Sequence, residues 1–337
     1  MRQRRVKAEG VGGVYHCISR IVGGDFLLEG EREKEVLRNQ IWKVADFCGI
    51  EVLTYCVMSN HVHILLRTPD PRFLRKIPNA ELARRARRIY SPEKADVFVK
   101  GLEDSDSEIR ERFRHQLLSR MGDVSQYMKE LKQRFSIWYN RPRRRIGTLW
   151  AERFKSVLVE DDPMALSTVA AYIDLNPVRA GIVDDPAEYR FCGYAEAMGG
   201  FKPARLGIAS LFGRGEHWAA AGSRYRLAIY GKQSLPKLRP SGEQSVASAK
   251  PGRSVDADRA AKAMNAGGRI PRSEALRCRI RYFTDGAVLG SREFVQSYFE
   301  ANRQRFGARR RDGPRAMKGA DWGELSCIRD LRRRAFG

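Results

Sequence analysis

Residues 55–66 read Tyr55-Cys56-Val57-Met58-Ser59-Asn60-His61-Val62-His63-Ile64-Leu65-Leu66. This pattern predicts one apolar strand, a break at 58–60 and a second strand that carries two histidines. Because alternate residues of a strand point to the same face, His61 and His63 project from one side and Val62 and Ile64 from the other. Two imidazoles on one rigid face form half of a divalent-metal site. A His-x-His pair also occurs on half-exposed strands that bind no metal, so both interpretations stay open at this point.

The composition indicates a globular, strongly basic protein of about two domains. Of the 337 residues, 42% are hydrophobic, which is enough for a buried core. Lys and Arg number 63 against 40 Asp and Glu, a formal charge of +23 that favours a polyanion, nucleic acid first and a membrane surface second. We find no apolar run of about 18 residues and no signal-peptide core, and the six cysteines form no C-x-x-C pair. We therefore expect a cytoplasmic protein in a reducing compartment, without membrane association.

The order of the predicted elements is that of an α+β, ferredoxin-like unit. Strands are predicted at 14–19, 51–57, 61–67 and 154–160, and amphipathic helices at 31–47 and 124–139. This succession is typical of a split βαβ or ferredoxin-like antiparallel sheet. Residues 69–122 interrupt it, and their basic helical segment, 80–90, is either a solvated insertion or a DNA-binding element.

A dense basic loop follows the helix at 124–139. It places four arginines beside three aromatic residues, namely Arg141, Arg143, Arg144 and Arg145 with Trp138, Tyr139 and Trp150. Arginines next to aromatic rings suit phosphate contacts and base stacking. A solvated loop with two core tryptophans has the same composition, so the residues alone do not separate these two interpretations.

A second polar pair lies on the helix that starts at Asp162-Pro163. Tyr172 and Asn176 are four residues apart, which predicts one shared face, and Pro177 ends the helix. If this helix packs over the sheet, a phenol, an amide oxygen and two imidazoles converge. A tyrosine hydroxyl can attack a phosphodiester when a cation offsets the developing charge, and this donor set suits Mg²⁺ or, better, Mn²⁺. Tyr172 can equally be a core tyrosine with a hydrogen-bonded hydroxyl.

Four motifs are specific in combination. They are Tyr15-His16-Cys17-Ile18-Ser19-Arg20, Met58-Ser59-Asn60-His61-Val62-His63, Gly147-Thr148-Leu149-Trp150 with Arg153-Phe154-Lys155-Ser156, and Tyr172-Ile173-Asp174-Leu175-Asn176-Pro177-Val178-Arg179-Ala180-Gly181. Together they resemble the single-tyrosine HUH transposases, most closely the REP-associated tyrosine transposase branch. The resemblance covers about residues 10–200 and implies a ferredoxin-like sheet with helices on one face.

The resemblance also implies a reaction and the role of each site residue. His61 and His63 would bind Mg²⁺ or Mn²⁺, Asn176 would complete the metal site, and Tyr172 would be the nucleophile. The implied substrate is single-stranded DNA beside a hairpin or palindromic repeat, cut to a 5′-phosphotyrosine and a free 3′-OH. Tyr139 is the competing nucleophile. The insertion at 69–122 is longer than the family leads us to expect, which leaves the docking of DNA open.

The motifs and the changes in composition divide the whole chain into four predicted regions. Residues 1–200 form the transposase-like domain, 201–232 an extension, 233–257 a linker and 258–337 a helical region. Helices predicted at 273–283 and 291–305, around a glycine turn, permit a helix-turn-helix DNA-binding region or a small helical bundle. The predicted nucleic-acid contacts are Arg141, Arg143, Arg144, Arg145, Arg153, Lys155, Arg179, Arg292 and Arg303.

The sequence thus predicts a metal-dependent single-stranded DNA endonuclease and strand transferase. Since one chain supplies one tyrosine, moving a segment needs two cuts, which favours a homodimer. Two alternatives stay open: a DNA-hairpin-binding protein of the same fold that does not cleave, and a basic RNA-binding protein. The RNA-binding alternative has less support, because the strand at 61–67 carries histidines where such sheets carry stacking aromatics.

Overall fold

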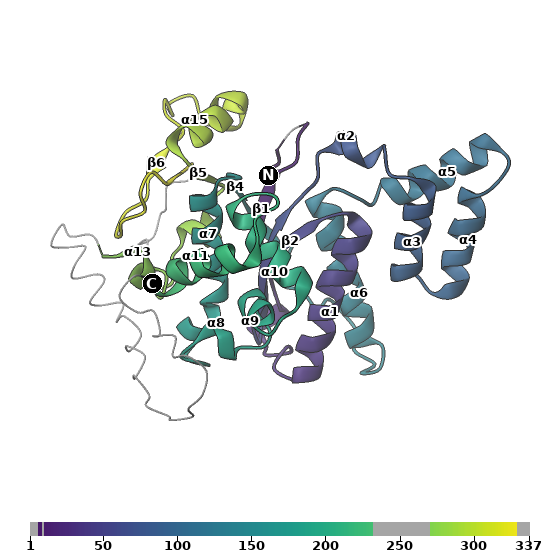
Figure 1. Cartoon of the computed structure of the whole chain (residues 1–337), viewed down its shortest axis with the longest axis horizontal. Coiled ribbons are helices and arrows are strands. Elements are labelled where there is room, and N and C mark those ends of the chain that lie inside the picture. The colour runs from purple at the N-terminus through teal and green to yellow at the C-terminus, as the bar shows by residue number, and fades with distance from the viewer. Residues whose placement is uncertain (1–5, 9, 232–269, 329–337) are drawn as a thin grey trace. The chain divides into compact units, whose positions relative to one another are not determined.

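The structure of the chain is a computed structural model that describes residues 6–8, 10–231 and 270–328. It separates into two compact units, which are described one at a time (Figure 1). The first unit comprises residues 7–52 and 57–155. The second unit comprises residues 53–56 and the described residues from 156 onward.

The strands form a mixed sheet with the order β2-β3-β1-β4-β5-β7-β6. Their bounds are Val14–Arg20 (β1), Glu51–Val57 (β2), His61–Arg67 (β3), Lys155–Val159 (β4), Val288–Gly290 (β5), Arg315–Ala316 (β6) and Ser326–Cys327 (β7). The order of the first four strands is that of the predicted ferredoxin-like unit, and the α+β class is confirmed. The sheet is not purely antiparallel, however, because β5 runs parallel to β4.

In the first unit, two helices pack on one another beside the antiparallel pair β1–β3. They are α1 (Glu31–Cys48) and α6 (Val124–Asn140). α1 buries an apolar stripe that includes Leu37, Ile41 and Val44, each burial worth roughly 1.5–3 kcal/mol, and it ends at Gly49 in the left-handed conformation that glycine adopts without strain. α6 begins where the Asp123 carboxylate accepts hydrogen bonds from the first-turn amides, a cap worth about 1 kcal/mol.

The predicted insertion at 69–122 is helical. It contains α2 (Pro71–Leu74), α3 (Asn79–Ile89), α4 (Pro92–Leu102) and α5 (Ser107–Leu118). Three arginines of α3 pair with acids: Arg84 contacts Glu81 and Asp46, Arg85 contacts Glu81, and Arg88 contacts Asp46. Such surface ion pairs contribute at most about 1 kcal/mol each, but they tie α3 to α1. The ion pairs support the interpretation of this segment as a solvated helical insertion.

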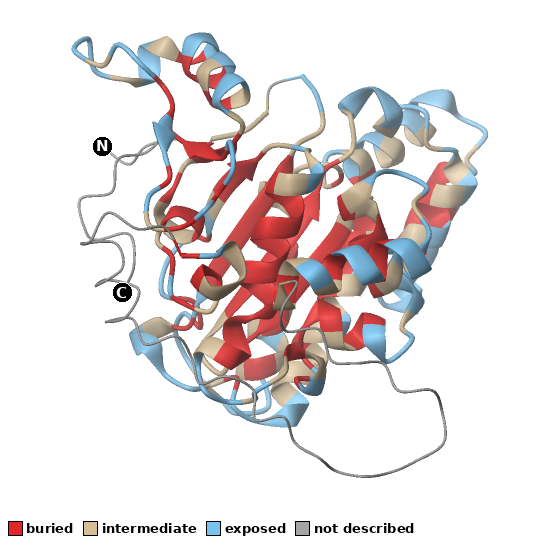
Figure 2. Ribbon diagram, turned by 60° about the vertical axis from the view of Figure 1, so that its left-hand side comes forward, coloured by how far each residue is buried: buried red, intermediate tan, exposed pale blue. Residues whose placement is uncertain are grey.

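The second unit is built around α7 (Pro163–Asp174), which is buried from Ala165 to its end. The Asp162 carboxylate caps it by accepting from the amides of Met164 and Ala165, at 2.8 and 3.2 Å. Further helices follow in chain order: α8 (Asn176–Arg179), α9 (Gly193–Met198), α10 (Lys202–Ala209), α11 (Trp218–Tyr230), α13 (Arg272–Ala275), α14 (Tyr282–Asp285) and α15 (Arg292–Ala301). Figure 2 shows that the central strands and the helix faces that pack on them are buried.

The prediction of one helix over 273–283 is wrong. Only the four-residue helices α13 and α14 form there, and residues 288–290 become a strand. The reason is tertiary: Val288 and Leu289 pair with Leu158 and Val159 of β4 and are fully buried, which local sequence does not reveal. The predicted second helix is present as α15, so a helix-turn-helix motif lacks its first member here. The predicted linker at 233–257 lies outside the described residues.

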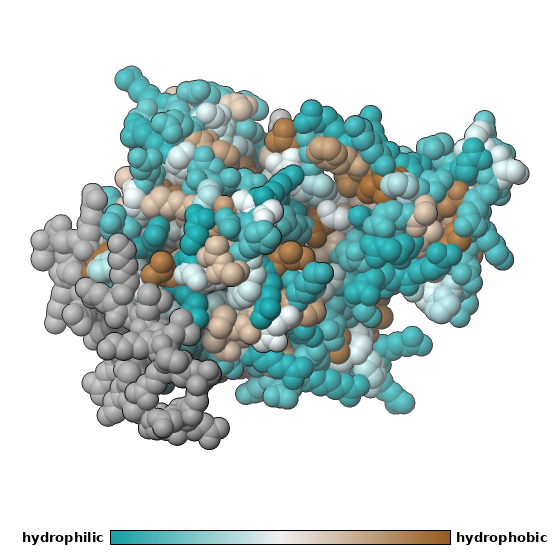
Figure 3. Space-filling model, in the orientation of Figure 1, coloured by the Kyte–Doolittle hydropathy of each residue, from teal (hydrophilic) through white to brown (hydrophobic). Residues whose placement is uncertain are grey.

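The exposed surface is polar, as the high content of charged residues leads us to expect. The face drawn in Figure 3 is mostly hydrophilic, with apolar side chains in small, scattered patches. None of the described helices combines the length and the apolar character needed to span a bilayer.

Candidate active site

Three histidines share one face of the β1–β3 pair in the first unit. His61 and His63 alternate along β3 as predicted, and Ile18 lies opposite His63, so His16 is the diagonal neighbour of His63 across the strands. The rings of His16 and His63 are stacked with centroids 5.0 Å apart, and those of His61 and His63 are also 5.0 Å apart. His16 and His63 are buried, and His61 is half-buried at the edge of the cluster.

Hydrogen bonds fix how the two predicted metal ligands are oriented. His61 Nδ1 lies 2.6 Å from Asn60 Oδ1, and because an amide oxygen only accepts, Nδ1 must carry the proton. The neutral ring then has its lone pair on Nε2. His63 Nδ1 lies 2.8 Å from His16 Nε2, so one of these nitrogens donates and the other accepts. With His63 as the donor, both rings of the His-x-His pair have their lone pair on Nε2, which is the arrangement that outer hydrogen bonds give to metal-binding histidines.

The turn before β3 holds the Asn60 side chain in place. Its amide nitrogen donates to the carbonyl of Gly24 at 3.1 Å, and the backbone of Met58 and His61 closes the turn at 2.9 Å. Among the described residues, no group of three or more His, Cys, Asp or Glu side chains is arranged to hold a metal ion. A metal at this face therefore needs a further ligand of another kind, such as an amide oxygen.

Tyr172 lies in the last turn of α7, in the second unit. Its side chain is only 2% exposed. The Arg179 guanidinium stacks on one side of the phenol at 4.0 Å from the ring centre, and the ring of Phe283, from α14, lies 4.7 Å away. The tyrosine is thus held in a defined position, with a side chain of the C-terminal region against it.

Asn176 does not continue the helix of Tyr172. α7 ends at Asp174, and Asn176 begins the short helix α8. Its side-chain nitrogen donates to the carbonyl of Ile173 at 2.9 Å, which caps the end of α7 and leaves Oδ1 as the atom suited to a cation. The spacing predicted one helical face for the pair, but Leu175 between the two helices departs from helical geometry. Pro177 has no N–H to bond the carbonyl of Ile173, so the hydrogen-bond pattern of α7 cannot continue through it.

Some of the predicted nucleic-acid contacts are bound to partners within the protein, and others are exposed. Arg179 donates to the carbonyls of Tyr172 and Leu276 at 2.6 and 2.7 Å, and burial lowers the pKa of its guanidinium from the ordinary value. Arg143 pairs with Glu33 and lies over the ring of Tyr139. Arg303 bonds carbonyls of its own turn. The exposed members of the set are Arg141, Arg143, Arg144, Arg153, Lys155 and Arg292.

Two residues near the candidate site were missed by sequence reasoning. His16 stood in a motif but was not assigned a role, because its contact with His63 depends on the register of two strands 47 residues apart. Asp174 is fully buried two residues after Tyr172. Its carboxylate accepts from Thr54 Oγ1 at 2.9 Å, from the amide of Tyr194 at 3.2 Å and from the hydroxyl of Tyr225. A charged residue at the end of a largely apolar helix is the signal that the sequence offers.

Asp174 should make stability depend on pH. Burial raises the pKa of its carboxyl from 3.8 to about 7, so the folded state holds this proton more tightly than the unfolded state does. The stabilising contribution is complete below pH 3.8 and is lost as the pH rises through 7, with an upper magnitude of about 4 kcal/mol. In Asp174→Asn this part of the pH dependence should disappear. Urea denaturation of both proteins at pH 4.5 and 7.5 measures the change in the free energy of unfolding between these pH values. An equal change in the wild type and in Asp174→Asn would contradict the prediction.

The ferredoxin-like strand order and the paired imidazoles on β3 are features of the transposase class that the sequence resembles. Residues 12–95, which include His61 and His63, match the family model described as "Transposase IS200 like". The resemblance is thus confirmed over this part of the chain and supports a transposase-like role in DNA processing.

Comparison with solved structures gives a chain described as "Structure of the REP associates tyrosine transposase bound to a REP hairpin". It is 16% identical, the match covers 59% of this chain and 86% of that chain, and the TM-score is 0.37. The comparison with curated proteins finds no match.

Proposed function

We propose that this protein is a metal-dependent single-stranded DNA endonuclease and strand transferase, with Tyr172 as the nucleophile. The observation that carries the proposal is the orientation of His61 and His63, whose Nδ1 atoms are both hydrogen-bonded on one face of the sheet. The family match over residues 12–95 supports it. The substrate class, single-stranded DNA beside a hairpin, follows from the resemblance of the sequence motifs.

In the proposed reaction, the Tyr172 oxygen attacks a backbone phosphorus as its proton leaves. The bond from phosphorus to the 3′ oxygen breaks, that oxygen takes up a proton as a free 3′-OH, and the 5′ phosphate stays on the tyrosine. His61 and His63, through Nε2, and Asn176, through Oδ1, would hold Mg²⁺ or Mn²⁺. The bound cation would offset the charge that develops on the non-bridging oxygens. Rejoining is the reverse attack by a 3′-OH on the phosphotyrosine.

The proposal is tested by trapping the covalent product. Hairpin DNA with a randomised single-stranded flank is labelled at the 3′ end, because the 3′ fragment is the part that stays on the protein. Incubation with Mn²⁺ should give a labelled band at the mass of the protein plus DNA on a denaturing gel, and a chelator should remove it. DNA binding without any adduct, in either metal, would leave a protein that only binds.

That second function has one observation in its favour. Tyr172 is buried against Phe283, so a strand of DNA does not reach its hydroxyl in this arrangement. A protein that binds hairpin DNA without cutting it needs no access to the tyrosine. The cleaving function therefore requires that α14 leaves the phenol before the reaction.

Loosening the contact of α14 should accelerate cleavage. Phe283→Leu removes the ring that lies against Tyr172, and we expect adduct formation to become about fivefold faster. The matched control is Phe299→Leu, another buried phenylalanine of the C-terminal region, which packs on Phe306 instead. Both changes remove a similar buried area and cost stability, so only a direct effect on Tyr172 distinguishes them. Equal adduct rates in the two variants, measured in time courses on the same DNA, would refute this role of Phe283.

A further inference from the structure

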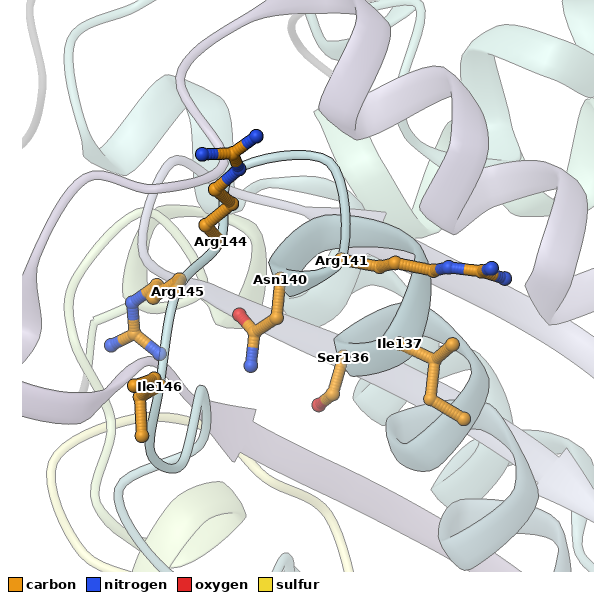
Figure 4. Close-up of a pocket in the computed structure, with 7 residues that line it drawn as sticks. All are labelled: Ser136, Ile137, Asn140, Arg141, Arg144, Arg145 and Ile146. Carbon is orange, nitrogen blue, oxygen red and sulfur yellow. The ribbon is translucent and has the colours of Figure 1, made fainter.

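A surface hollow lies at the end of α6, inside the first unit (Figure 4). Its volume is about 530 Å³, within the range of small-ligand pockets. The end of the helix contributes Ser136, Ile137, Asn140 and Arg141, and the following loop contributes residues 144–146. The hollow therefore joins the basic loop of the sequence to the last turn of a rigid helix.

Asn140 has an unpaired acceptor in this hollow. Its side-chain nitrogen donates to the carbonyl of Gly147 at 3.2 Å, which settles which end of the amide is the oxygen. Oδ1 is buried and has no hydrogen-bond partner among the described residues. Figure 4 shows the amide on the side of the helix end that faces Arg145 and Ile146. Buried polar atoms are rarely left without a partner, and a ligand that donates a hydrogen bond here would supply one.

The neighbouring hydroxyl already has two partners within the protein. Ser136 donates to the carbonyl of Lys132 at 2.8 Å and accepts from the indole nitrogen of Trp150 at 3.0 Å. Its hydrogen bonds hold the helix and the tryptophan together. Asn140 Oδ1 is thus the acceptor in this hollow that is left for a donor of the ligand.

The rim combines apolar and cationic groups. Ile137 and Ile146 are 56% and 96% exposed, so two large apolar side chains stand open to a ligand at the rim. Arg141 and Arg144 are exposed beside them, and Arg144 has a φ of 48°, in the left-handed region that few non-glycine residues adopt. A flat apolar ring would match the isoleucines, an amino group the Asn140 acceptor, and a phosphate the arginines.

We propose that this hollow binds one unpaired nucleotide of single-stranded DNA whose base carries an exocyclic amine, that is adenine, cytosine or guanine rather than thymine. The exocyclic amine donates to Asn140 Oδ1, the base lies on Ile137 and Ile146, and the adjacent phosphates contact Arg141 and Arg144. Thymine fits poorly because its one ring donor lies between two carbonyl oxygens, which would face the oxygens of Asn140 and Gly147. This inference rests on the proposed function, since it assigns a base preference to the same DNA.

The test uses fluorescence anisotropy with the full-length protein and four labelled strands: dT12 and dT12 with one central dA, dC or unsubstituted purine nucleotide. The purine nucleotide has the adenine ring without its amine. We expect the dA and dC strands to bind about fivefold more tightly than the dT and purine strands, the scale of one hydrogen bond. This comparison needs only the wild-type protein.

Variants then locate the effect. Asn140→Leu should bind all four strands equally, whereas Gln133→Leu, an exposed amide on the same helix outside the hollow, should keep the preference. Arg141→Gln with Arg144→Gln should weaken all strands alike and keep the preference. Equal binding of the dA and purine strands by the wild type, or a preference that survives in Asn140→Leu, overturns the inference while DNA binding stands. If no strand binds, the proposed function fails together with it.

Discussion

Replacing Tyr172 by phenylalanine should abolish the covalent protein–DNA adduct, by at least about 1,000-fold, because the attacking oxygen is removed and no other group takes its place. The change is confined to one atom. The ring keeps its contacts with Arg179 and Phe283, at 4.0 and 4.7 Å, so the fold should be retained. The adduct of the 3′-labelled strand on a denaturing gel measures the effect. Circular dichroism and DNA binding, which should both match the wild type, exclude unfolding as the cause.

Tyr139→Phe is the matched control for this experiment. Tyr139 is also largely buried, at 8% exposure, and also lies under an arginine, with Arg143 at 4.1 Å from the ring centre. It therefore shares the surroundings of Tyr172 but not its proposed role. An adduct that persists in Tyr172→Phe and is lost in Tyr139→Phe would transfer the nucleophile to Tyr139. An adduct that persists in both single variants would mean that another residue is the nucleophile.

The second large effect concerns the histidines of β3. His61→Ala and His63→Ala should each reduce metal-dependent adduct formation by about 1,000-fold or more, because each removes one of two imidazole ligands from a site with few others. Manganese binding, followed by calorimetry without DNA, should weaken in parallel. His217→Ala, an exposed histidine of the second unit, is the control and should behave as the wild type.

Replacing His16 should reduce adduct formation less than replacing His61 or His63, and excess metal should restore it. Its Nε2 fixes the ring of His63 from behind, and the loss of such a partner typically weakens metal binding 10- to 100-fold. His16→Phe keeps a flat ring in the buried position and removes the hydrogen bond. Adduct formation should then fall at low Mn²⁺ and recover at high Mn²⁺, whereas His63→Ala should not recover. If metal affinity is unchanged in all three histidine variants, the metal site lies elsewhere.

The parts of the fold that follow from local patterns were predictable. The alternation along residues 61–67 gives β3 with its bounds, and the apolar spacing of 31–47 and 124–139 gives α1 and α6 to within one residue. These patterns are set by which side chains face the core, and neighbours in sequence are enough to reveal them. The sharing of one face by His61 and His63 followed from the same rule.

The remainder depended on contacts between distant segments. The bond between His16 and His63 requires the register of β1 against β3, and the contact of Phe283 with Tyr172 joins residues 111 positions apart in the sequence. Short strands such as β5 are also invisible locally, since three residues that pair with β4 carry too little pattern of their own. The four-residue spacing of Tyr172 and Asn176 predicted a site residue, but it could not predict that Tyr172 is buried.

The place of Phe283 in the chain sets how the phenol can be uncovered. Four residues, 284–287, connect Phe283 to Val288, where β5 is anchored on β4. A fully extended tether of that length spans roughly 14 Å. If β5 stays paired with β4, this length limits how far Phe283 can move from Tyr172 when the phenol is uncovered. Gly286 fits this tether as it is packed here, because a Cβ there would meet the carbonyl of Tyr282 at 2.4 Å.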